Sequence, residues 1–183
     1  MRVIAGTARG RSLVTPSGNH TRPTTDRIKE TLFNMIQYDV RDSRFLDLFS
    51  GSGGIAIEAL SRGAKEAVLV ENNREALSCI RQNIDKIGFE NVSKVMPMDV
   101  MQALRRLDQS GQPFDIIFMD PPYNKDFEAN ILPFLLESKI IKKDTLIIVE
   151  ASLETDISYM ENLGCEVEKV KEYKTNRHIF LRC

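Results

Sequence analysis

From residue 44 onward, short apolar runs alternate with longer stretches of helical pattern. The runs at 45–49, 67–71, 93–96, 114–119 and 145–149 have the length of buried strands. The stretches at 54–62, 73–87, 100–108, 127–138 and 154–163 have the length of helices, and Pro133 is predicted to kink or divide the fourth of them. This alternation predicts an α/β fold, in which helices cover both faces of a mostly parallel sheet.

The two ends of the chain depart from this alternation. Residues 167–170 and 178–181 are apolar-alternating runs joined by a polar turn, which predicts an antiparallel hairpin that completes a seven-stranded sheet. Residues 1–22 have the pattern of short strands and turns, and apolar residues then recur at helical spacing up to Gln37. We therefore divide the chain into an N-terminal basic extension, residues 1–43, with a small β-hairpin and a helix, and a core, residues 44–183.

The composition allows this fold to form a core of its own. The chain has 183 residues, 42% of them hydrophobic, and a domain of that size buries roughly 70% of its unfolded surface. No apolar run approaches the ~20 residues of a membrane-spanning helix. The start of the chain turns polar by Thr7, too early for a signal peptide. We therefore expect a cytoplasmic protein with no membrane partner.

Cysteine and histidine narrow the possible chemistry. Cys79, Cys165 and Cys183 are odd in number and widely spaced, which predicts neither a disulfide framework nor a zinc site. His20 and His178 have no partner at the spacing of metal ligands. We therefore expect no metal.

The net charge of −1 conceals an uneven distribution. The first 30 residues hold six basic and two acidic side chains, for a net +4, and the other 153 hold 19 basic and 24 acidic ones, for −5. A basic extension on an acidic body is suited to contact with phosphates, and the same charges also suit an ordinary solvated surface. Charge alone leaves both interpretations open.

A glycine-rich turn follows the first predicted core strand. Gly51 and Gly53 lie between that strand and a helix, where the backbone can approach a ligand closely. Glu71 follows 20 residues after Gly51, where a carboxylate can accept the hydroxyls of an adenosine ribose. The pattern admits a dinucleotide or S-adenosylmethionine. Asp47 favours the methyl donor, because a carboxylate would repel a pyrophosphate and attract a cation.

Two further acidic residues end predicted strands. Asp99 follows the third strand, where it can accept an adenine amino group or cap the helix that begins at Val100. Asp120-Pro121-Pro122-Tyr123 follows the fourth strand. The two prolines fix the backbone and lack N–H donors, which leaves the carboxylate and the carbonyls as acceptors beside an aromatic ring. This combination suits an amino group on a stacked heterocycle.

Taken together, these motifs resemble a known enzyme family. The core is similar to class I S-adenosylmethionine-dependent methyltransferases, and Asp-Pro-Pro-Tyr resembles the signature of amino-group N-methyltransferases. Segments 2–6, 9–11, 22–27, 32–34, 47–53 and 58–64 are similar to the bacterial 16S ribosomal RNA guanine-N2 methyltransferase family, so the resemblance spans nearly the whole chain. One departure is the stretch 54–57, where a bulkier sequence is expected; it affects helix packing more than chemistry.

The resemblance implies a Rossmann-like fold, S-adenosyl-L-methionine as donor with S-adenosyl-L-homocysteine as product, and transfer to N2 of a guanine in 16S rRNA. The catalytic residues expected are Asp120, Pro121, Pro122 and Tyr123. The cofactor-binding residues expected are Asp47, Phe49, Ser50, Gly51, Ser52, Gly53, Glu71, Asn72, Asp99 and Val100. The RNA-binding residues expected are Arg9, Arg11, Arg22, Thr24 and Arg27.

We further expect a monomer that acts on the small ribosomal subunit or an assembly intermediate. Two alternatives stay open at this point. One is an adenine-N6 or glutamine-N methyltransferase, because the Asp-Pro-Pro-Tyr turn suits any amino group on a planar carrier. The other is a nucleotide-binding or RNA-binding module without catalysis.

Overall fold

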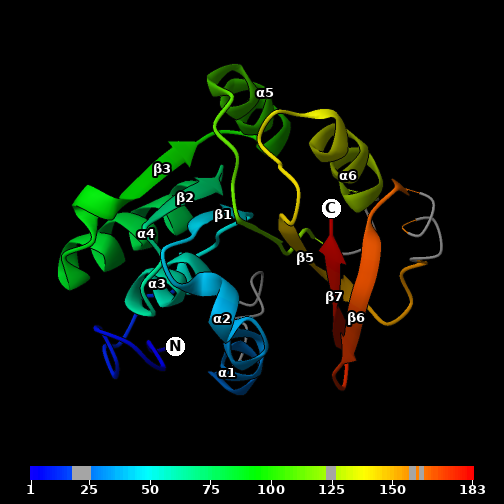
Figure 1. Cartoon of the computed structure of the whole chain (residues 1–183). Coiled ribbons are helices and arrows are strands. Elements are labelled where there is room, and N and C mark those ends of the chain that lie inside the picture. The colour runs from blue at the N-terminus through cyan, green and yellow to red at the C-terminus, as the bar shows by residue number, and fades with distance from the viewer. Residues whose placement is uncertain (18–25, 123–126, 157–159, 161–162) are drawn as a thin grey trace.

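The structure, a computed structural model, describes residues 1–17, 26–122, 127–156, 160 and 163–183. It contains a seven-stranded sheet in the order β3-β2-β1-β4-β5-β7-β6 (Figure 1). The parallel strands are β1 (Arg44–Leu48), β2 (Glu66–Glu71), β3 (Ser93–Pro97), β4 (Ile116–Met119) and β5 (Leu146–Ser152). The antiparallel hairpin consists of β6 (Glu166–Glu172) and β7 (Asn176–Arg182), with β7 paired to β5. The predicted mixed sheet is therefore confirmed.

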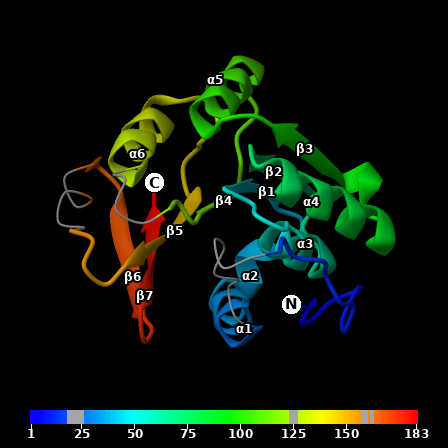
Figure 2. The same cartoon turned by 180° about the vertical axis from the view of Figure 1, so that it is seen from behind.

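Helices cover both faces of the sheet (Figures 1 and 2). One face carries α1 (Asp26–Met35), α2 (Gln37–Val40), α3 (Gly54–Ser61) and α4 (Arg74–Ile87), whose apolar residues share one buried cluster. The other face carries α5 (Val100–Ser110) and α6 (Phe127–Glu137), which contribute to a second cluster. A short 3₁₀ helix, η1 (Glu90–Val92), precedes β3.

Local sequence signals explain where the core helices begin and end. In α4, the Asn73 side chain accepts the backbone N–H groups of residues 75 and 76, and Gly88 ends the helix at a φ of 84°. Helix α6 runs through Pro133, so the expected division there is wrong. The helix expected at 154–163 lies partly outside the described residues, and 153–155 form a turn and a bend.

The N-terminal extension packs on the same core as α3 and α4. Val3 and Leu13 are buried in the cluster that α1 also enters. The side chain of Asn83, on α4, accepts the backbone N–H of Val14 at 2.7 Å and donates to its carbonyl at 2.8 Å. Asn83 also donates to the carbonyl of Ser52 at 3.0 Å, which joins the extension to the glycine-rich turn.

A buried ion cluster anchors α1. The Nζ atom of Lys29 lies 3.3 Å from Oε2 of Glu58 and donates to the carbonyl of Arg2 at 2.6 Å. Arg62 donates to Oε1 of Glu58 at 2.8 Å, and Glu58 also accepts the backbone N–H of Ile4. Lys29 and Glu58 are both fully buried, so one of the extension's cations has a structural role. Breaking such a cluster by removing one partner costs roughly 3–5 kcal/mol.

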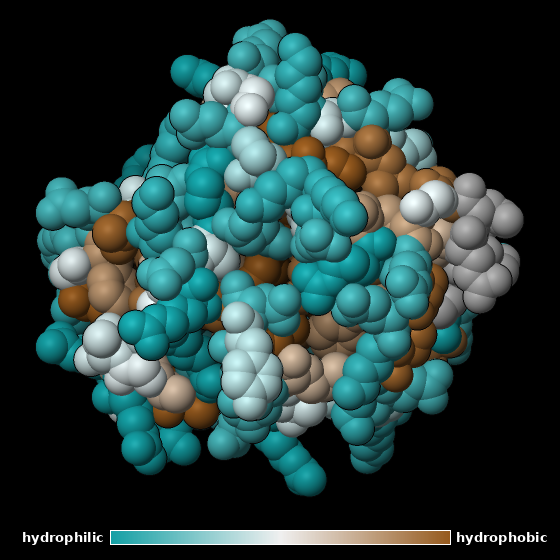
Figure 3. Space-filling view, in the orientation of Figure 1, coloured by the Kyte–Doolittle hydropathy of each residue, from teal (hydrophilic) through white to brown (hydrophobic). Residues whose placement is uncertain are grey.

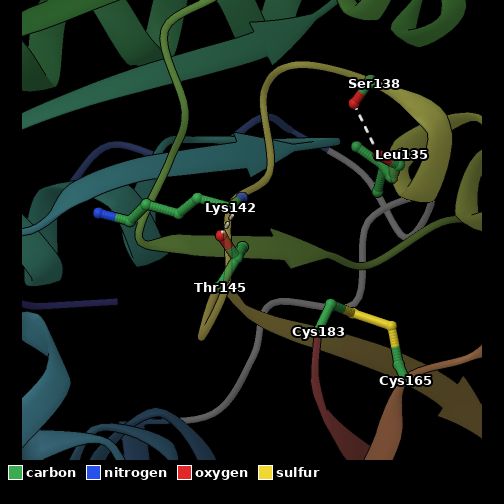
Figure 4. The surroundings of a disulfide bond; sticks show 6 residues. All are labelled: Leu135, Ser138, Lys142, Thr145, Cys165 and Cys183. Atoms are coloured by element: carbon green, nitrogen blue, oxygen red, sulfur yellow. Dashed lines mark hydrogen bonds between the residues drawn. A yellow bond between two sulfur atoms is a disulfide. The ribbon is translucent and has the colours of Figure 1, made fainter.

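A disulfide joins Cys165 to Cys183 (Figure 4), so the prediction that the cysteines form no such bond is wrong. Cys165 directly precedes β6 and Cys183 directly follows β7. Because Glu166 pairs with Arg182 in the antiparallel register, the two cysteines lie side by side. The free cysteine, Cys79, is buried on α4. The wide spacing in sequence was misleading because a hairpin brings its two distant ends together.

The surface in Figure 3 is mostly hydrophilic, with hydrophobic residues gathered towards α6 and the β6–β7 hairpin. None of the described helices has the length and apolarity needed to cross a bilayer. Across the same described part of the chain, no three His, Cys, Asp or Glu side chains are grouped as metal ligands.

Candidate active site at the carboxyl ends of the strands

The sheet order creates a point where the chain changes direction beside β1. Strand β1 leads to α3 on one face of the sheet, and the neighbouring strand β4 leads to α6 on the other. Because the connections diverge, this fold is expected to have its ligand crevice at the carboxyl ends of β1 and β4, where open α/β sheets bind ligands. The glycine-rich turn follows β1, and Asp120 follows β4.

The glycine-rich turn is held in a strained and specific conformation. Gly51 has a φ of 54° and Gly53 a φ of 81°, and a side chain at Gly53 would also press on Leu69 at 3.1 Å. Phe49, which is not a glycine, has a φ of 67°. Ser50 steadies the turn by donating from Oγ to the carbonyl of Asp47 at 2.8 Å. Backbone strain of this kind is found at ligand-binding sites.

Glu71 locks this turn to the end of β2. Its Oε2 accepts the N–H of Gly51 at 2.8 Å, and its Oε1 accepts those of Asn72 and Asn73 at 2.9 and 2.8 Å. A carboxylate offers about four acceptor positions, so a hydroxyl can still bind Oε2. The side chain of Asn72 is exposed beside it. Ribose recognition by Glu71 remains a prediction that this geometry permits.

Asp99 caps α5. Its Oδ1 accepts the N–H of Met101 at 2.9 Å and that of Gln102 at 3.4 Å, as in the capping interpretation of the sequence. Val100 follows it and is buried. Because Oδ1 makes both capping bonds, Oδ2 can still accept an adenine amino group, and that contact remains a prediction.

Asp47 is a buried carboxyl group at the centre of the crevice. It is 1% exposed, and its Oδ2 accepts the N–H of Ala56 at 3.2 Å. Its Oδ1 has no hydrogen-bond partner among the described residues. Burial raises the pKa of Asp47 to about 8, the bond from Ala56 opposes this rise, and the charge of Glu71 adds to it. A bound cation would stabilise the ionised form of this carboxyl group.

Asp120 directly follows β4, the strand that pairs with β1 and its Asp47. Burial of its carboxyl group, followed by the charges of Glu150 and Asp47, raises the pKa of Asp120 well above its ordinary value. Pro121 is buried and Pro122 is exposed. Tyr123 lies outside the described residues. The charge of Asp47 therefore disfavours ionisation of Asp120, and both carboxyl groups have a raised pKa.

A polar group that the sequence motifs did not indicate lies beside Asp120 in the sheet. Glu150 ends the apolar run of β5, and its carboxylate contacts His178 and Asn176 of β7. The sequence signal that could have indicated this group is a glutamate directly after four apolar residues, in the strand that neighbours the one leading to Asp120. The histidine had been considered only as a metal ligand.

The expected RNA-binding arginines are only partly described. Arg9 and Arg27 line a cavity of about 580 Å³, which they share with Arg2, Asp26 and Glu30. Arg2 is paired with Asp26 at 3.0 Å. Arg11 donates to the carbonyl of Lys86 at 3.1 Å, on the side of α4. Arg22 and Thr24 lie outside the described residues.

Relatives of this chain place it among methyltransferases. Residues 1–181 match the family model described as Conserved hypothetical protein 95. The chain belongs to this family. It is 37% identical over 172 residues to "Putative rRNA methyltransferase YlbH" of Bacillus subtilis (strain 168), covering 94% of this chain and 92% of that protein. It is 35% identical over 157 residues to "Ribosomal RNA small subunit methyltransferase D" of Escherichia coli (strain K12), covering 86% and 77%.

Solved structures of this family share the whole fold. "Putative methyltransferase yhhF from Escherichia coli" superposes with a TM-score of 0.85 at 31% identity, covering 100% of this chain and 97% of that one. A more distant structure, the "putative RNA methyltransferase PH1948 from Pyrococcus horikoshii", has 18% identity and a TM-score of 0.73, covering 93% and 92%; it supports the fold alone. These comparisons confirm the family resemblance and the class I methyltransferase fold.

Proposed function

We propose that this protein transfers a methyl group from S-adenosyl-L-methionine to the exocyclic N2 amino group of a guanine in 16S ribosomal RNA. The observation that carries the proposal is the pair Asp47 and Asp120. Both are acidic groups of raised pKa at one crevice, and Asp47 Oδ1 has no partner in the described part of the chain. A cationic ligand would favour their ionised forms, whereas a pyrophosphate would be repelled.

The residues around β1 and β2 fit the methyl donor. Asp47 would face the cationic end of the donor, and the backbone of residues 49–53 would lie close against it. Glu71 and Asn72 would bind its ribose. Asp99 and Val100 would border its adenine. When bound, this donor supplies a methyl carbon already activated by the positive sulfonium, and S-adenosyl-L-homocysteine is the product.

The residues after β4 fit an amino-bearing base. Asp120 would accept one hydrogen of the amino group and the Pro121 carbonyl the other, which orients the nitrogen lone pair towards the methyl carbon. Because the donor is activated, positioning of the nucleophile at about 3 Å contributes most of the catalysis. Tyr123 would stack on the base, which must leave its neighbours in the RNA to reach this crevice.

The relatives named as rRNA methyltransferases support RNA as the carrier of this base. Arg9 and Arg27 present guanidinium groups to one cavity, and Arg11 lies beside α4. We assign these three, together with Arg22 and Thr24, to contacts with the RNA backbone. The substrate we propose is the small ribosomal subunit or an assembly intermediate, bound by a monomer in the cytoplasm.

Two experiments test the proposal. Calorimetry should detect binding of S-adenosyl-L-homocysteine, with no binding of NAD; binding of NAD alone would contradict the assigned cofactor. Incubation with a methyl-labelled donor and 30S particles that lack the modification should place the label on RNA. Label on ribosomal protein would favour a glutamine-N methyltransferase, and no transfer to any carrier would favour a binding module.

A further inference from the structure

Three titratable side chains form one row behind the proposed site. Met119 pairs with Val149, so the next residues along β4 and β5, Asp120 and Glu150, are neighbours. Glu150 in turn pairs directly with His178 of β7. Because side chains alternate along a strand, all three lie on the face of the sheet that carries α1 and α3.

Hydrogen bonds connect this row to a tyrosine. Oε2 of Glu150 lies 3.1 Å from Nε2 of His178, and Nδ1 of His178 lies 3.2 Å from the hydroxyl of Tyr173. Oε1 of Glu150 accepts from Asn176 at 2.5 Å. Both ring nitrogens of His178 are therefore engaged. Tyr173 is only half-buried, so these hydrogen bonds lead from Glu150, the neighbour of Asp120 across the strands, towards solvent.

The apolar surroundings of His178 make burial of this polar row unfavourable for the free energy of folding. His178 is fully buried, and the rings of Phe118 and Phe180 lie 6.1 and 6.4 Å from its own. Buried polar networks are retained only when every member is satisfied, and apolar packing would hold two strands together equally well. The fold therefore does not require a glutamate and a histidine at these positions.

The charges around the row define what it can do. Burial and the charge of Glu150 raise the pKa of Tyr173 to about 12, so its hydroxyl keeps its proton and can donate. The acidic group outside the row that acts on Asp120 is Asp47. On the facing helix α1, the cation Lys29 is bound by Glu58.

We propose, on the basis of the function proposed above, that Glu150 and His178 are positioning residues that take the methylation proton from Asp120. In the reaction the amino nitrogen forms a bond to the methyl carbon with its lone pair, and the carbon–sulfur bond breaks with its electron pair on sulfur. The nitrogen then carries one positive charge. Its N–H electrons return to nitrogen as the proton moves to Oδ of Asp120.

Asp120 then gives the proton to Glu150, and Glu150 gives it to Nε2 of His178 as the Nδ1 proton of His178 moves to the oxygen of Tyr173. The half-buried hydroxyl of Tyr173 releases its own proton to solvent at the same time. This transfer returns Asp120 to the carboxylate form that holds the next amino group. Without the pair, Asp120 would remain protonated in a crevice covered by the donor and the base. General acid–base assistance of this kind contributes roughly 10²–10⁴-fold in rate.

The test uses Glu150→Gln and Tyr173→Phe in the full chain, with Tyr38→Phe as the matched control. Tyr38 is 91% exposed and loses the same hydroxyl away from the site. We expect kcat to fall about 100-fold in Glu150→Gln and about 10-fold in Tyr173→Phe. KM for RNA and affinity for S-adenosyl-L-homocysteine should stay within threefold, and Tyr38→Phe should match the wild type.

A second readout separates this role from a structural one. Since the charge of Glu150 raises the pKa of Asp120, NMR titration of its side-chain carbon in the ligand-free protein should show a lower pKa in Glu150→Gln. The acid limb of the kcat–pH profile should move to lower pH while its plateau falls. An unmoved Asp120 pKa, or Tyr173→Phe with wild-type kcat, would overturn the inference. Failure of the proposed function itself would show as an inactive wild type or a fully active Asp120→Ala.

Discussion

The two halves of the crevice are built in different ways. On the cofactor half, the acidic side chains bind backbone N–H groups: Glu71 accepts those of Gly51 and Asn73, and Asp99 caps its own helix. On the base half, Asp120 and Glu150 follow one another across neighbouring strands, and Glu150 contacts the side chains of Asn176 and His178 on β7. The first half is therefore built on bonds from carboxylates to backbone N–H groups, and in the second Glu150 binds side chains of the neighbouring strand.

The largest expected effect lies on the base half. Asp120→Ala removes the acceptor that orients the amino group, so methyl transfer should fall by at least about 10³-fold. Affinity for S-adenosyl-L-homocysteine, measured by calorimetry, should stay within tenfold because the cofactor half is intact. Retention of full activity would show that Asp120 is wrongly assigned and that the two halves do not divide the work in this way.

The matching change on the cofactor half is Glu71→Gln. It removes the charge that binds Gly51 and the proposed ribose contact, so the affinity for S-adenosyl-L-homocysteine should fall about 10–100-fold. At saturating donor, kcat should change less than threefold. Glu66→Gln, at the opposite end of the same strand, is the control and should bind as the wild type does. Equal losses of affinity in both variants would show that the effect comes from disturbing β2 and not from losing a ligand contact.

Asp47 lies between the halves and links them to pH. Its folded-state pKa of about 8 lies above the ordinary value of 3.8, so the ligand-free protein holds a proton that the unfolded chain has lost. Its contribution to stability is therefore complete at low pH and is lost as pH rises towards and through 8. Asp47→Asn should remove this dependence, so its ligand-free melting temperature at pH 8.5 should exceed that of the wild type.

The same group should act in the opposite direction on binding. A cationic donor selects the ionised carboxylate, so wild-type affinity should increase as pH rises from 6 to 8, by up to about tenfold per unit for one proton. Calorimetric titrations of Asp47→Asn should show a weaker dependence and lower affinity at pH 8. If Asp47→Asn binds the donor as tightly as the wild type, the Asp47 carboxylate does not attract the donor's positive charge.

The smallest effect concerns the basic extension. Neutralising Arg9 and Arg11 together, as Arg9→Gln with Arg11→Gln, should weaken RNA binding several-fold. The slope of log K against log salt should become shallower by about 1.5 if both contact phosphates. The control pair, Arg105→Gln with Arg106→Gln, changes two exposed arginines on α5, on the other face of the sheet. An equal change in both double variants would show that the extension contributes no more to RNA binding than other charged surfaces do.

The contrast between the halves also explains how far the sequence could be interpreted. The strands, the glycine-rich turn and the extent of α4 follow from local signals, and all were predicted. The Asp99 cap was one of two interpretations, and the structure shows it. These features depend on residues within one βα unit, where spacing and residue type determine the conformation.

The features that were missed depend on register between distant strands. Cys165 and Cys183 meet because the hairpin pairs Glu166 with Arg182, and Glu150 meets His178 in the pairing of β5 with β7. Lys29 was counted with the basic extension, whereas it is buried against Glu58. None of these contacts has a local signature, although the predicted hairpin contained the information needed for the cysteines.

The most direct test of the account is the identity of the methylated atom. Wild-type protein and Asp120→Ala should be incubated with labelled S-adenosyl-L-methionine and 30S particles that lack the modification, and the RNA should then be digested to nucleosides. The account predicts label in N2-methylguanosine with the wild type and none with the variant. Label in N6-methyladenosine would contradict the assigned base, and equal labelling by both proteins would contradict the assigned site.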